Sequence, residues 1–325
     1  MSSGLPRLAE AAAATPVSRI GLGLAAVGRP GYINLGRDRD LPAERTVEAM
    51  RRRSHELLDA AYAQGVRYLD AARSYGRAEE FLADWLRARP DATRDVVVGS
   101  KWGYTYVADW RADAETHEVK DHSVATYERQ REESRALLGD HLDLYQIHSV
   151  TPDSPALTDP ALHARLARLA AEGVTVGIST SGPAQGDAIR AALEVEADGL
   201  PLFRTVQSTY NLLEPSAGPA LEEAHAAGRT VIVKEAMANG RLAAPDRVPT
   251  ALRRAAEEVG ATPDALALAA VLRCPWVTVA LSGAATEAQL RSNLTAASFR
   301  LPEPLEDVAE PPEAYWRHRS SLPWT

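Results

Sequence analysis

The stretch Gly228-Arg229-Thr230-Val231-Ile232-Val233-Lys234 shows the pattern that decides the fold. A glycine closes a helical stretch, as expected of a left-handed C-terminal cap, and a short β-branched run follows at once. The run is apolar at consecutive positions instead of alternating, which is typical of a parallel strand buried on both faces. Gly65 and Gly173 stand in the same place before the runs 66–70 and 174–179.

Working outward, eight runs of this kind alternate with longer amphipathic stretches. The expected strands cover residues 19–24, 66–70, 95–101, 142–148, 174–179, 204–208, 230–234 and 276–282. Eight strands with helices between them predict a (β/α)8 TIM barrel, an α/β fold, as a single domain over residues 1–325. A doubly wound open sheet is the alternative, and the count of eight favours the barrel. We expect the barrel at about residues 17–297 and an irregular acidic tail at 298–325.

The composition excludes several classes of protein. The chain has 325 residues, of which 45% are hydrophobic and 25% charged, as in an ordinary globular protein. Its one cysteine, Cys274, cannot form an internal disulfide and favours a reducing compartment. No secretory signal and no spanning helix are expected, because no long uncharged apolar run occurs. The net charge of −8, without a basic block, makes nucleic acid and anionic membrane poor partners, and a cytoplasmic location is expected.

Four polar residues stand at or just after predicted strand ends, where barrel enzymes place their functional groups. They are Asp70, Tyr75, Lys101 and His148. A carbonyl that accepts a hydride needs a proton, and a tyrosine hydroxyl can supply it if a nearby cationic lysine lowers its pKa from about 10. An aspartate would pair with that lysine, and a neutral histidine would hydrogen-bond the carbonyl oxygen. Each residue alone has an ordinary structural role, whereas the four together predict catalysis.

The order and spacing of these residues resemble the Asp-Tyr-Lys-His tetrad of the aldo-keto reductase family. Other similar segments are GVRYLDAARSYG (65–76), DLYQIH (143–148), VGIS (176–179), VQSTYN (206–211) and QLRSN (289–293). The resemblance covers about residues 17–297. It implies a (β/α)8 oxidoreductase that transfers hydride between NADPH or NADH and a small-molecule carbonyl or alcohol. Tyr75 would be the general acid–base, with neither metal nor flavin.

The resemblance also implies a cofactor site. Ser179 and Gln207 match the positions that hold the nicotinamide carboxamide, and Thr180 stands where the family usually has asparagine. Lys234 stands where the family often has an aromatic residue that stacks on the nicotinamide, and the alternative is a surface ion pair with Glu235. The full set of implied cofactor residues is Ser179, Thr180, Gln207, Lys234, Arg241, Ser282, Gly283, Ala285, Gln289 and Asn293.

The choice between NADP and NAD depends on the segment after the eighth strand, residues 282–289. A helix beginning there should offer its N-terminus to a phosphate. Members that prefer NADP usually carry Lys or Arg on this segment, whereas Ala285 and Gln289 stand here. We therefore expect at most a small preference for NADP, unless Arg241 or Arg291 reaches the 2′-phosphate.

A long aromatic loop follows the third predicted strand. Trp102, Tyr104 and Trp110 suit a substrate wall, and packing of the loop on its own aromatic residues is an equal alternative. His117 and His122 are expected to be exposed, and no metal site is expected from their pattern. Three large aromatic residues in the tail need a surface to cover, namely Tyr315, Trp316 and Trp324.

Two other classes of function stay open. A Schiff-base lyase would use Lys101 or Lys234 as its amine, but such chemistry has no use for Tyr75 and His148. A non-catalytic subunit that binds the cofactor is the other alternative, and the complete tetrad argues against it. The sequence leaves open the substrate, the direction of the reaction and the oligomeric state.

Overall fold

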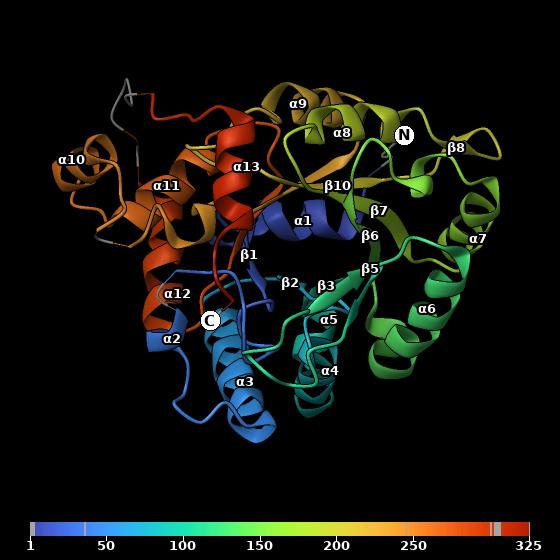
Figure 1. Ribbon diagram of the computed structural model, residues 1–325, viewed down its shortest axis with the longest axis horizontal. Helices are drawn as coiled ribbons and strands as arrows, with labels where there is room; N and C mark the ends of the chain where they lie inside the picture. The colour runs from blue at the N-terminus through green and yellow to red at the C-terminus, as the bar shows by residue number, and fades with distance from the viewer. Residues whose placement is uncertain (1–3, 36, 245, 300, 302–306, 325) are drawn as a thin grey trace.

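The computed structural model describes residues 4–35, 37–244, 246–299, 301 and 307–324. Eight parallel strands close into a barrel in the order β1-β12-β11-β10-β7-β6-β3-β2 (Figure 1). The strands are β1 (Ile20–Gly23), β2 (Tyr68–Asp70), β3 (Val97–Trp102), β6 (Leu144–Val150), β7 (Thr175–Thr180), β10 (Thr205–Thr209), β11 (Thr230–Lys234) and β12 (Val279–Ser282). The predicted (β/α)8 barrel in a single domain is confirmed, and the open-sheet alternative is excluded because the sheet closes.

Helices alternate with the barrel strands along the chain and pack around the outside of the barrel (Figure 1). The outer ring consists of α3 (Val47–Ala63), α4 (Ala78–Ala88), α6 (Val124–Leu138), α7 (Pro160–Ala171), α8 (Gln185–Leu193), α9 (Gly218–Ala226), α11 (Pro263–Leu272) and α12 (Glu287–Leu294). Added to this repeat are helices α1 (Pro6–Ala14), α2 (Arg37–Asp40), α5 (Ala92–Asp95), α10 (Thr250–Glu258) and α13 (Pro312–Ser320). Two small hairpins pair β4 (Tyr104–Tyr106) with β5 (Glu118–Lys120) and β8 (Glu196–Ala197) with β9 (Leu200–Pro201).

The interior of the barrel is packed by one large side chain against two glycines. Tyr68 on β2 is fully buried. A Cβ on Gly99 of β3 would lie 2.4 Å from its hydroxyl oxygen, and a Cβ on Gly21 of β1 would lie 2.9 Å from its ring. Glycines on both neighbouring strands therefore leave the space that the ring fills. The Tyr68 hydroxyl in turn donates to Asp70 Oδ1 at 3.1 Å, so this packing also fixes a residue at the mouth of the barrel.

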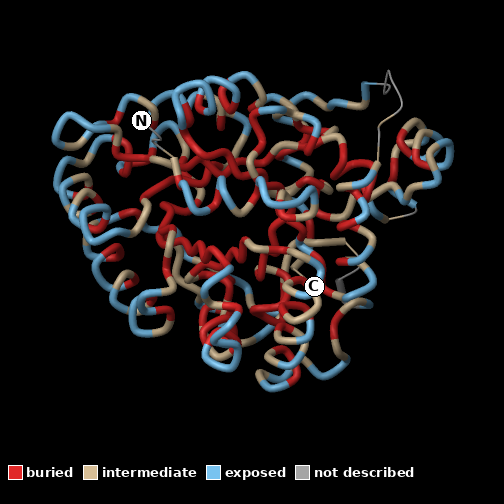
Figure 2. Tube along the Cα trace, turned by 180° about the vertical axis from the view of Figure 1, so that it is seen from behind, coloured by how far each residue is buried: buried red, intermediate tan, exposed pale blue. Residues whose placement is uncertain are grey.

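Helix α1 covers the N-terminal end of the barrel. Leu5 and Leu8 are buried against Val97 and Leu144, the first residues of β3 and β6. The Leu5 amide donates to Thr230 Oγ1 at the start of β11 at 2.8 Å. Figure 2 shows the buried residues running through the centre of the molecule and the exposed ones on the outer helices. The C-terminal end of the strands is therefore the open mouth.

The tail is not irregular throughout, which corrects the prediction for residues 298–325. Helix α13 buries Tyr315 and Trp316 in a hydrophobic cluster with Leu213 and Leu242, because large aromatic side chains gain burial there. In Figure 1 this helix lies in front of the barrel. Part of the predicted acidic tail, residues 302–306, lies outside the described residues.

Candidate active site

The four residues of the predicted tetrad come together at the mouth of the barrel. Asp70 ends β2, Lys101 and His148 lie near the ends of β3 and β6, and Tyr75 lies in the turn between β2 and α4. The Lys101 ammonium donates to Asp70 Oδ2 at 2.5 Å and to the Ala71 carbonyl oxygen at 2.9 Å. Its nitrogen lies 5.0 Å from the centre of the Tyr75 ring, and the His148 ring meets that ring edge-on at 5.5 Å.

The position of Tyr75 depends on two glycines in close contact. Gly76 has a φ of +61°, and a Cβ there would lie 2.6 Å from the Gly28 carbonyl oxygen. A Cβ on Gly28 would lie 2.4 Å from the Tyr75 carbonyl oxygen. The loop after β1 and the turn after β2 therefore pack backbone against backbone, as only glycine allows. This contact holds Tyr75 at the mouth and brings Arg29 beside it.

Asp70 is buried and accepts hydrogen bonds from three side chains. Besides Lys101, the Tyr68 hydroxyl and the Gln207 amide nitrogen donate to Oδ1, at 3.1 Å and 2.9 Å. A buried carboxylate requires such donors, because each unpaired charge in the interior costs several kcal/mol. The three bonds fix Asp70, and through it the ammonium of Lys101.

His148 is held as a neutral imidazole. Burial lowers its pKa well below the ordinary range, and the positive charge of Lys101 lowers it further. His122 Nε2 donates to the His148 carbonyl oxygen at 2.8 Å, and His122 Nδ1 is paired with Ser154 Oγ at 2.7 Å. Burial lowers the pKa of His122 to about 4, so this ring is neutral as well. The prediction that His122 is exposed is wrong, because it is a buried support of the His148 backbone.

Tyr75 retains its proton at neutral pH. Burial raises the pKa of its hydroxyl well above the usual value, and the negative charge of Asp70 adds to the effect. The guanidinium of Arg29 acts in the opposite direction. The sequence-based expectation that this pKa is lowered is therefore wrong, because burial raises it more than the nearby guanidinium lowers it. A tyrosine that keeps its proton is in the correct state to donate it to a carbonyl oxygen.

Arg29 is a second cation at the mouth that sequence reasoning missed. It is buried, and its Nη1 donates to the Ser74 carbonyl at 2.8 Å and to Glu118 on β5 at 2.5 Å. Its guanidinium lies 5.2 Å from the centre of the Tyr75 ring and 4.7 Å from that of Trp324. The long loop after β3 and the last residues of the chain thus both reach Tyr75 through one arginine.

A third charged group couples β11 to the tail. Glu235 binds the guanidinium of Arg319 on α13 through both carboxylate oxygens. Its side chain is 8% exposed and that of Lys234 is 13% exposed, so the alternative of a surface pair is wrong. Burial alone would raise the pKa of Glu235, but Arg319 and Lys234 together lower it to about 2. Burial lowers the pKa of Lys234 to about 8.

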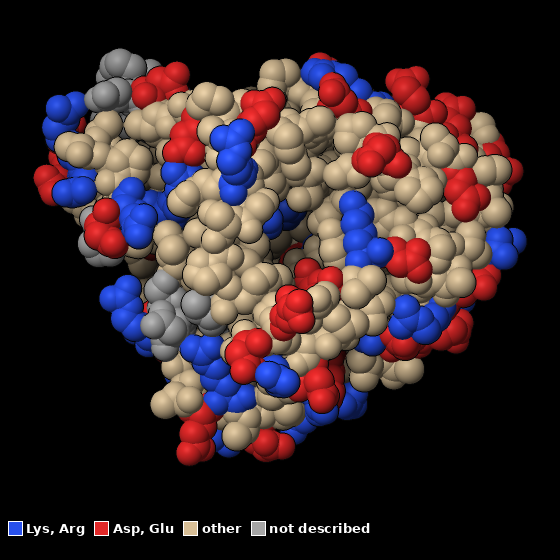
Figure 3. Space-filling model, viewed as in Figure 1, with Lys and Arg blue, Asp and Glu red and all other residues tan. Residues whose placement is uncertain are grey.

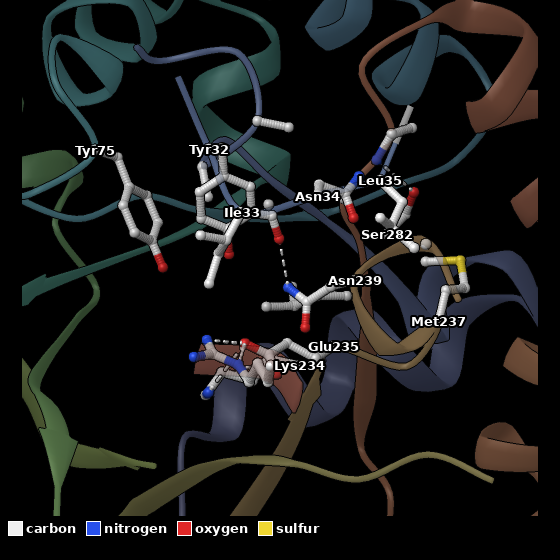
Figure 4. Close-up of a pocket in the computed structure, with 18 of the residues that line it drawn as sticks. Tyr32, Ile33, Asn34, Leu35, Tyr75, Lys234, Glu235, Met237, Asn239 and Ser282 are labelled. Atoms are coloured by element: carbon white, nitrogen blue, oxygen red, sulfur yellow. Dashed lines mark hydrogen bonds and ion pairs between the residues drawn. The ribbon is translucent and has the colours of Figure 1, made fainter. Parts of the chain in front are cut away.

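One cavity of about 520 Å³ lies at the mouth of the barrel. Of the residues described above, it is lined by Arg29, Asp70, Tyr75, His148, Lys234, Glu235 and Arg319. Figure 3 shows a hollow near the centre of this face, with basic and acidic side chains around it. In Figure 4, Tyr75 lies on one side of the cavity and Ser282 on the other, with Tyr32 between them. Tyr75 follows β2 and Ser282 ends β12, and these two strands flank β1 in the barrel.

The structure divides the predicted cofactor residues into two groups. Those that line the cavity are Gln207, Lys234, Ser282, Gly283, Gln289 and Asn293. Ser179 and Thr180 lie behind the lining: Ser179 Oγ accepts the amide of the lining residue Ser149 at 2.9 Å. Ala285 and Arg241 also lie outside the lining, and Arg241 is paired with Glu310 in the tail.

Gln207 carries an unused hydrogen-bonding atom at the bottom of this cavity. Its amide nitrogen donates to Asp70 and to Gln146 Oε1, whereas its own Oε1 is buried without a partner. A buried unpaired acceptor costs about 1–3 kcal/mol unless a donor reaches it. The amide nitrogen of a nicotinamide carboxamide is such a donor. The residues present therefore fit a nicotinamide beside Asp70 and Tyr75.

Of the three aromatic residues predicted to form a substrate wall, one lines the cavity. Tyr104 lines the cavity, and its ring meets the His148 ring edge-on at 5.1 Å. Trp102 is fully buried and packs on Tyr127 of α6 at 5.1 Å, so it does not reach the cavity. Trp110 packs near Phe81, and its Nε1 donates to the Arg45 carbonyl at 2.7 Å. The two indoles stabilise the loop instead, as the packing alternative predicted.

The tail supplies an aromatic residue that the loop does not. Trp324 lines the cavity and stacks on His117, with ring centres 4.1 Å apart and planes 4° apart. His117 is thereby buried, which corrects its predicted exposure. Tyr32, on the loop after β1, meets the Trp324 indole edge-on at 6.2 Å. The aromatic content of the tail was the only sequence signal for this contact.

Two kinds of feature are absent from the described part of the chain. None of its helices combines the length and the apolarity that crossing a membrane requires. No group of three or more His, Cys, Asp or Glu side chains among these residues is arranged to hold a metal ion.

Comparison with known proteins agrees with the geometry. Residues 19–310 match the Aldo/keto reductase family. The chain is 26% identical over 283 residues to the aldo-keto reductase str7 of Strobilurus tenacellus, and the match covers 78% of each chain. A solved Pseudomonas aeruginosa protein assigned to the aldo-keto reductases is 26% identical, with 86% of this chain and 90% of that chain covered and a TM-score of 0.61.

A further solved structure shows the same fold with a nucleotide bound. The aldo/keto reductase of Klebsiella pneumoniae, in complex with NADP and acetate, is 24% identical, with 88% of both chains covered and a TM-score of 0.63. The closed barrel with its polar mouth and the family match together define an NAD(P)-dependent oxidoreductase. This chain belongs to the aldo/keto reductase family.

Proposed function

We propose that this protein catalyses reversible hydride transfer between the nicotinamide of NADH or NADPH and a small carbonyl or alcohol, with Tyr75 as general acid–base. The observation that carries the proposal is the tetrad itself. A protonated tyrosine and a neutral histidine line the cavity side by side, and a lysine bound to a buried aspartate lies next to the tyrosine.

Each member of the tetrad has a distinct role in carbonyl reduction. A bound reduced nicotinamide supplies the hydride to the carbonyl carbon. Tyr75 donates its hydroxyl proton to the carbonyl oxygen as negative charge develops there. His148, neutral because of its burial, donates a hydrogen bond to the same oxygen and orients it. Lys101, fixed by Asp70, places a positive charge beside the tyrosine as its proton leaves.

The cavity offers separate surfaces to cofactor and substrate. Gln207 would accept a hydrogen bond from the nicotinamide carboxamide, and the N-terminus of α12 would face the phosphates. The substrate would occupy the side lined by Tyr32, Tyr104 and Trp324. A mouth that combines aromatic faces with paired charges suits a polar small molecule.

A Schiff-base role for Lys101 is not favoured. Its ammonium is fully buried and engaged by Asp70 and the Ala71 carbonyl, so it is not available as a free amine. Lys234 lines the cavity, but an imine there would leave Tyr75 and His148 without a function.

Replacing the tyrosine hydroxyl tests the proposal. Tyr75→Phe should lower turnover at least about 100-fold, because the proton donor is lost. The dissociation constants of NADH and NADPH should change little, since the ring remains. A nicotinamide absorbance assay over aldehydes, ketones and sugars would measure turnover, and isothermal titration calorimetry would measure cofactor binding.

Tyr62→Phe is a matched control, because the Tyr62 hydroxyl donates to Asp95 on the outside of the barrel. It should retain wild-type turnover. Undiminished turnover in Tyr75→Phe would refute the assigned role. Cofactor binding without turnover on any substrate in the wild type would support the non-catalytic alternative.

A further inference from the structure

The end of the cavity away from the tetrad contains two carboxylates. Asp40, at the end of α2, and Asp264, on α11, both line it together with Gln289 and Asn293 of α12. In the proposed function the nicotinamide lies on the opposite side, at Gln207 and Tyr75. The remainder of a bound dinucleotide would then extend toward α12, and its adenosine ribose would meet these side chains.

The amide side chains at this end are committed to the two carboxylates. Gln289 Nε2 donates to Asp40 Oδ2 at 2.7 Å, and Gln289 Oε1 accepts the Ala285 amide at 2.9 Å. Asn293 Nδ2 donates to Asp264 Oδ2 at 2.7 Å. One of the two N–H donors of Gln289 thus goes to Asp40, and this bond fixes the Asp40 carboxylate at the edge of the cavity.

The arginines expected to bind a 2′-phosphate are engaged elsewhere. Arg241 is paired with Glu310 of the tail, and Arg291 is exposed and paired with Glu287 at 3.2 Å. Among the described residues lining this end, Arg39 is the one cation. It is exposed, so solvent screens its attraction for an anion.

Two residues that precede α2 in the chain, Ile33 and Leu35, are bound to the loop after β11. Asn239, in the loop after β11, donates through Nδ2 to the Ile33 carbonyl at 3.0 Å and accepts the Leu35 amide at 3.0 Å. The first of these bonds is drawn in Figure 4. Ile33 and Leu35 are thus bound at Asn239, and Asp40 is bound at Gln289 of α12.

We infer that Asp40 makes this enzyme select NAD over NADP. Its carboxylate would accept a hydrogen bond from the ribose 2′-hydroxyl of NAD and would repel the 2′-phosphate of NADP. This is the chemistry by which an acidic residue selects NAD at other dinucleotide sites. The inference rests on the proposed function, since it takes the cavity to be the dinucleotide site. It replaces the sequence-based expectation of a small preference for NADP.

Direct binding measurements test the selection without turnover. Isothermal titration calorimetry with NAD⁺ and NADP⁺ should show at least about tenfold tighter binding of NAD⁺ to the wild type, the size of one hydrogen bond to a charged group. Asp40→Asn should reduce the ratio of the two affinities about tenfold. The fragments 5′-AMP and adenosine 2′,5′-bisphosphate should show the same ratios, because they probe the adenosine end alone.

Asp187→Asn is a charge-matched control, since Asp187 lies on the outer helix α8 with a side chain 73% exposed. It should leave the NAD⁺/NADP⁺ ratio unchanged, and thermal melts should confirm that all variants are folded. Equal or tighter binding of NADP⁺ by the wild type would overturn the inference. So would an Asp40→Asn ratio equal to that of Asp187→Asn, or a strong NADP⁺ affinity that Arg39→Ala removes. Failure of both nucleotides to bind would overturn the proposed function itself.

Discussion

Two buried lysines stand on opposite sides of the barrel mouth, and their surroundings differ. Lys101 on β3 donates to the Asp70 carboxylate at 2.5 Å and to a backbone carbonyl at 2.9 Å. Lys234 on β11 donates to the Thr209 hydroxyl at 3.0 Å and lies 3.8 Å from Glu235, whose oxygens are held by Arg319. The charge of Lys101 is matched within the barrel, whereas that of Lys234 depends on a helix at the far end of the chain.

The difference predicts opposite effects on stability. A buried charge with good partners is stabilised by them. Removing one member of such an ion pair leaves the other charge buried and unpaired, which destabilises the fold. A buried charge with poor partners carries a desolvation cost that its removal relieves. Burial lowers the pKa of Lys234 to about 8, which is the sign of such a cost. Three substitutions test this comparison.

Lys101→Met should have the largest effect. Turnover should fall at least about 100-fold, because the ammonium beside Tyr75 is lost and the remaining cation, Arg29, is already paired with Glu118. The free energy of unfolding should fall by about 3–5 kcal/mol, since Asp70 stays buried with only neutral donors. Steady-state kinetics and urea unfolding at pH 7 would measure the two effects.

The third lysine of the chain supplies the matched control. Lys120 on β5 is exposed, so Lys120→Met should change neither turnover nor stability appreciably. Normal turnover with an unchanged pH–rate profile in Lys101→Met would show that Lys101 has only a structural role.

The functional side chains that stand at the ends of neighbouring barrel strands could be predicted from the sequence. Buried parallel strands have a recognisable apolar run, and their ends meet at one edge, so Asp70, Lys101 and His148 were placed together by the fold alone. The glycines before the strands marked the same boundaries. All eight predicted strands overlap the observed ones.

The partners brought from distant segments could not be predicted. Arg29 and Arg319 are separated by most of the chain, and no local pattern distinguishes them from surface arginines. Their ion pairs with Glu118 and Glu235 form only when a hairpin and the C-terminal helix fold over the mouth. Burial then decided the electrostatics, because it raises the pKa of Tyr75 more than the charge of Arg29 lowers it.

Arg319→Met should have the next largest effect, because it isolates Glu235 from its main partner. The free energy of unfolding at pH 7 should fall by about 3 kcal/mol. In the wild type the pKa of Glu235 is about 2, below its unfolded value, so its stabilising contribution is present at neutral pH and is lost as the pH falls toward 2. The difference in free energy of unfolding between wild type and variant should therefore become smaller as the pH is lowered.

Urea unfolding between pH 3 and pH 7 would measure this difference. Arg317 is exposed on the same helix, so Arg317→Met should have the same free energy of unfolding as the wild type at every pH. A difference for Arg319→Met that stays constant with pH would mean that packing of the side chain, and not its charge, holds the helix.

Lys234→Met should have the smallest effect and the opposite sign. The folded-state pKa of Lys234 is about 8 and lies below its unfolded value, so the wild type gains stability as the pH rises from about 8 to the unfolded pKa. The variant has no such group and should be more stable than the wild type by about 1–3 kcal/mol at pH 7, with the difference vanishing near pH 11. Thermal or urea unfolding at pH 7 and pH 10.5 would measure both. A variant less stable than the wild type at pH 7 would mean that the hydrogen bond to Thr209 and the attraction of Glu235 outweigh the desolvation of the ammonium, and that the two lysines are alike.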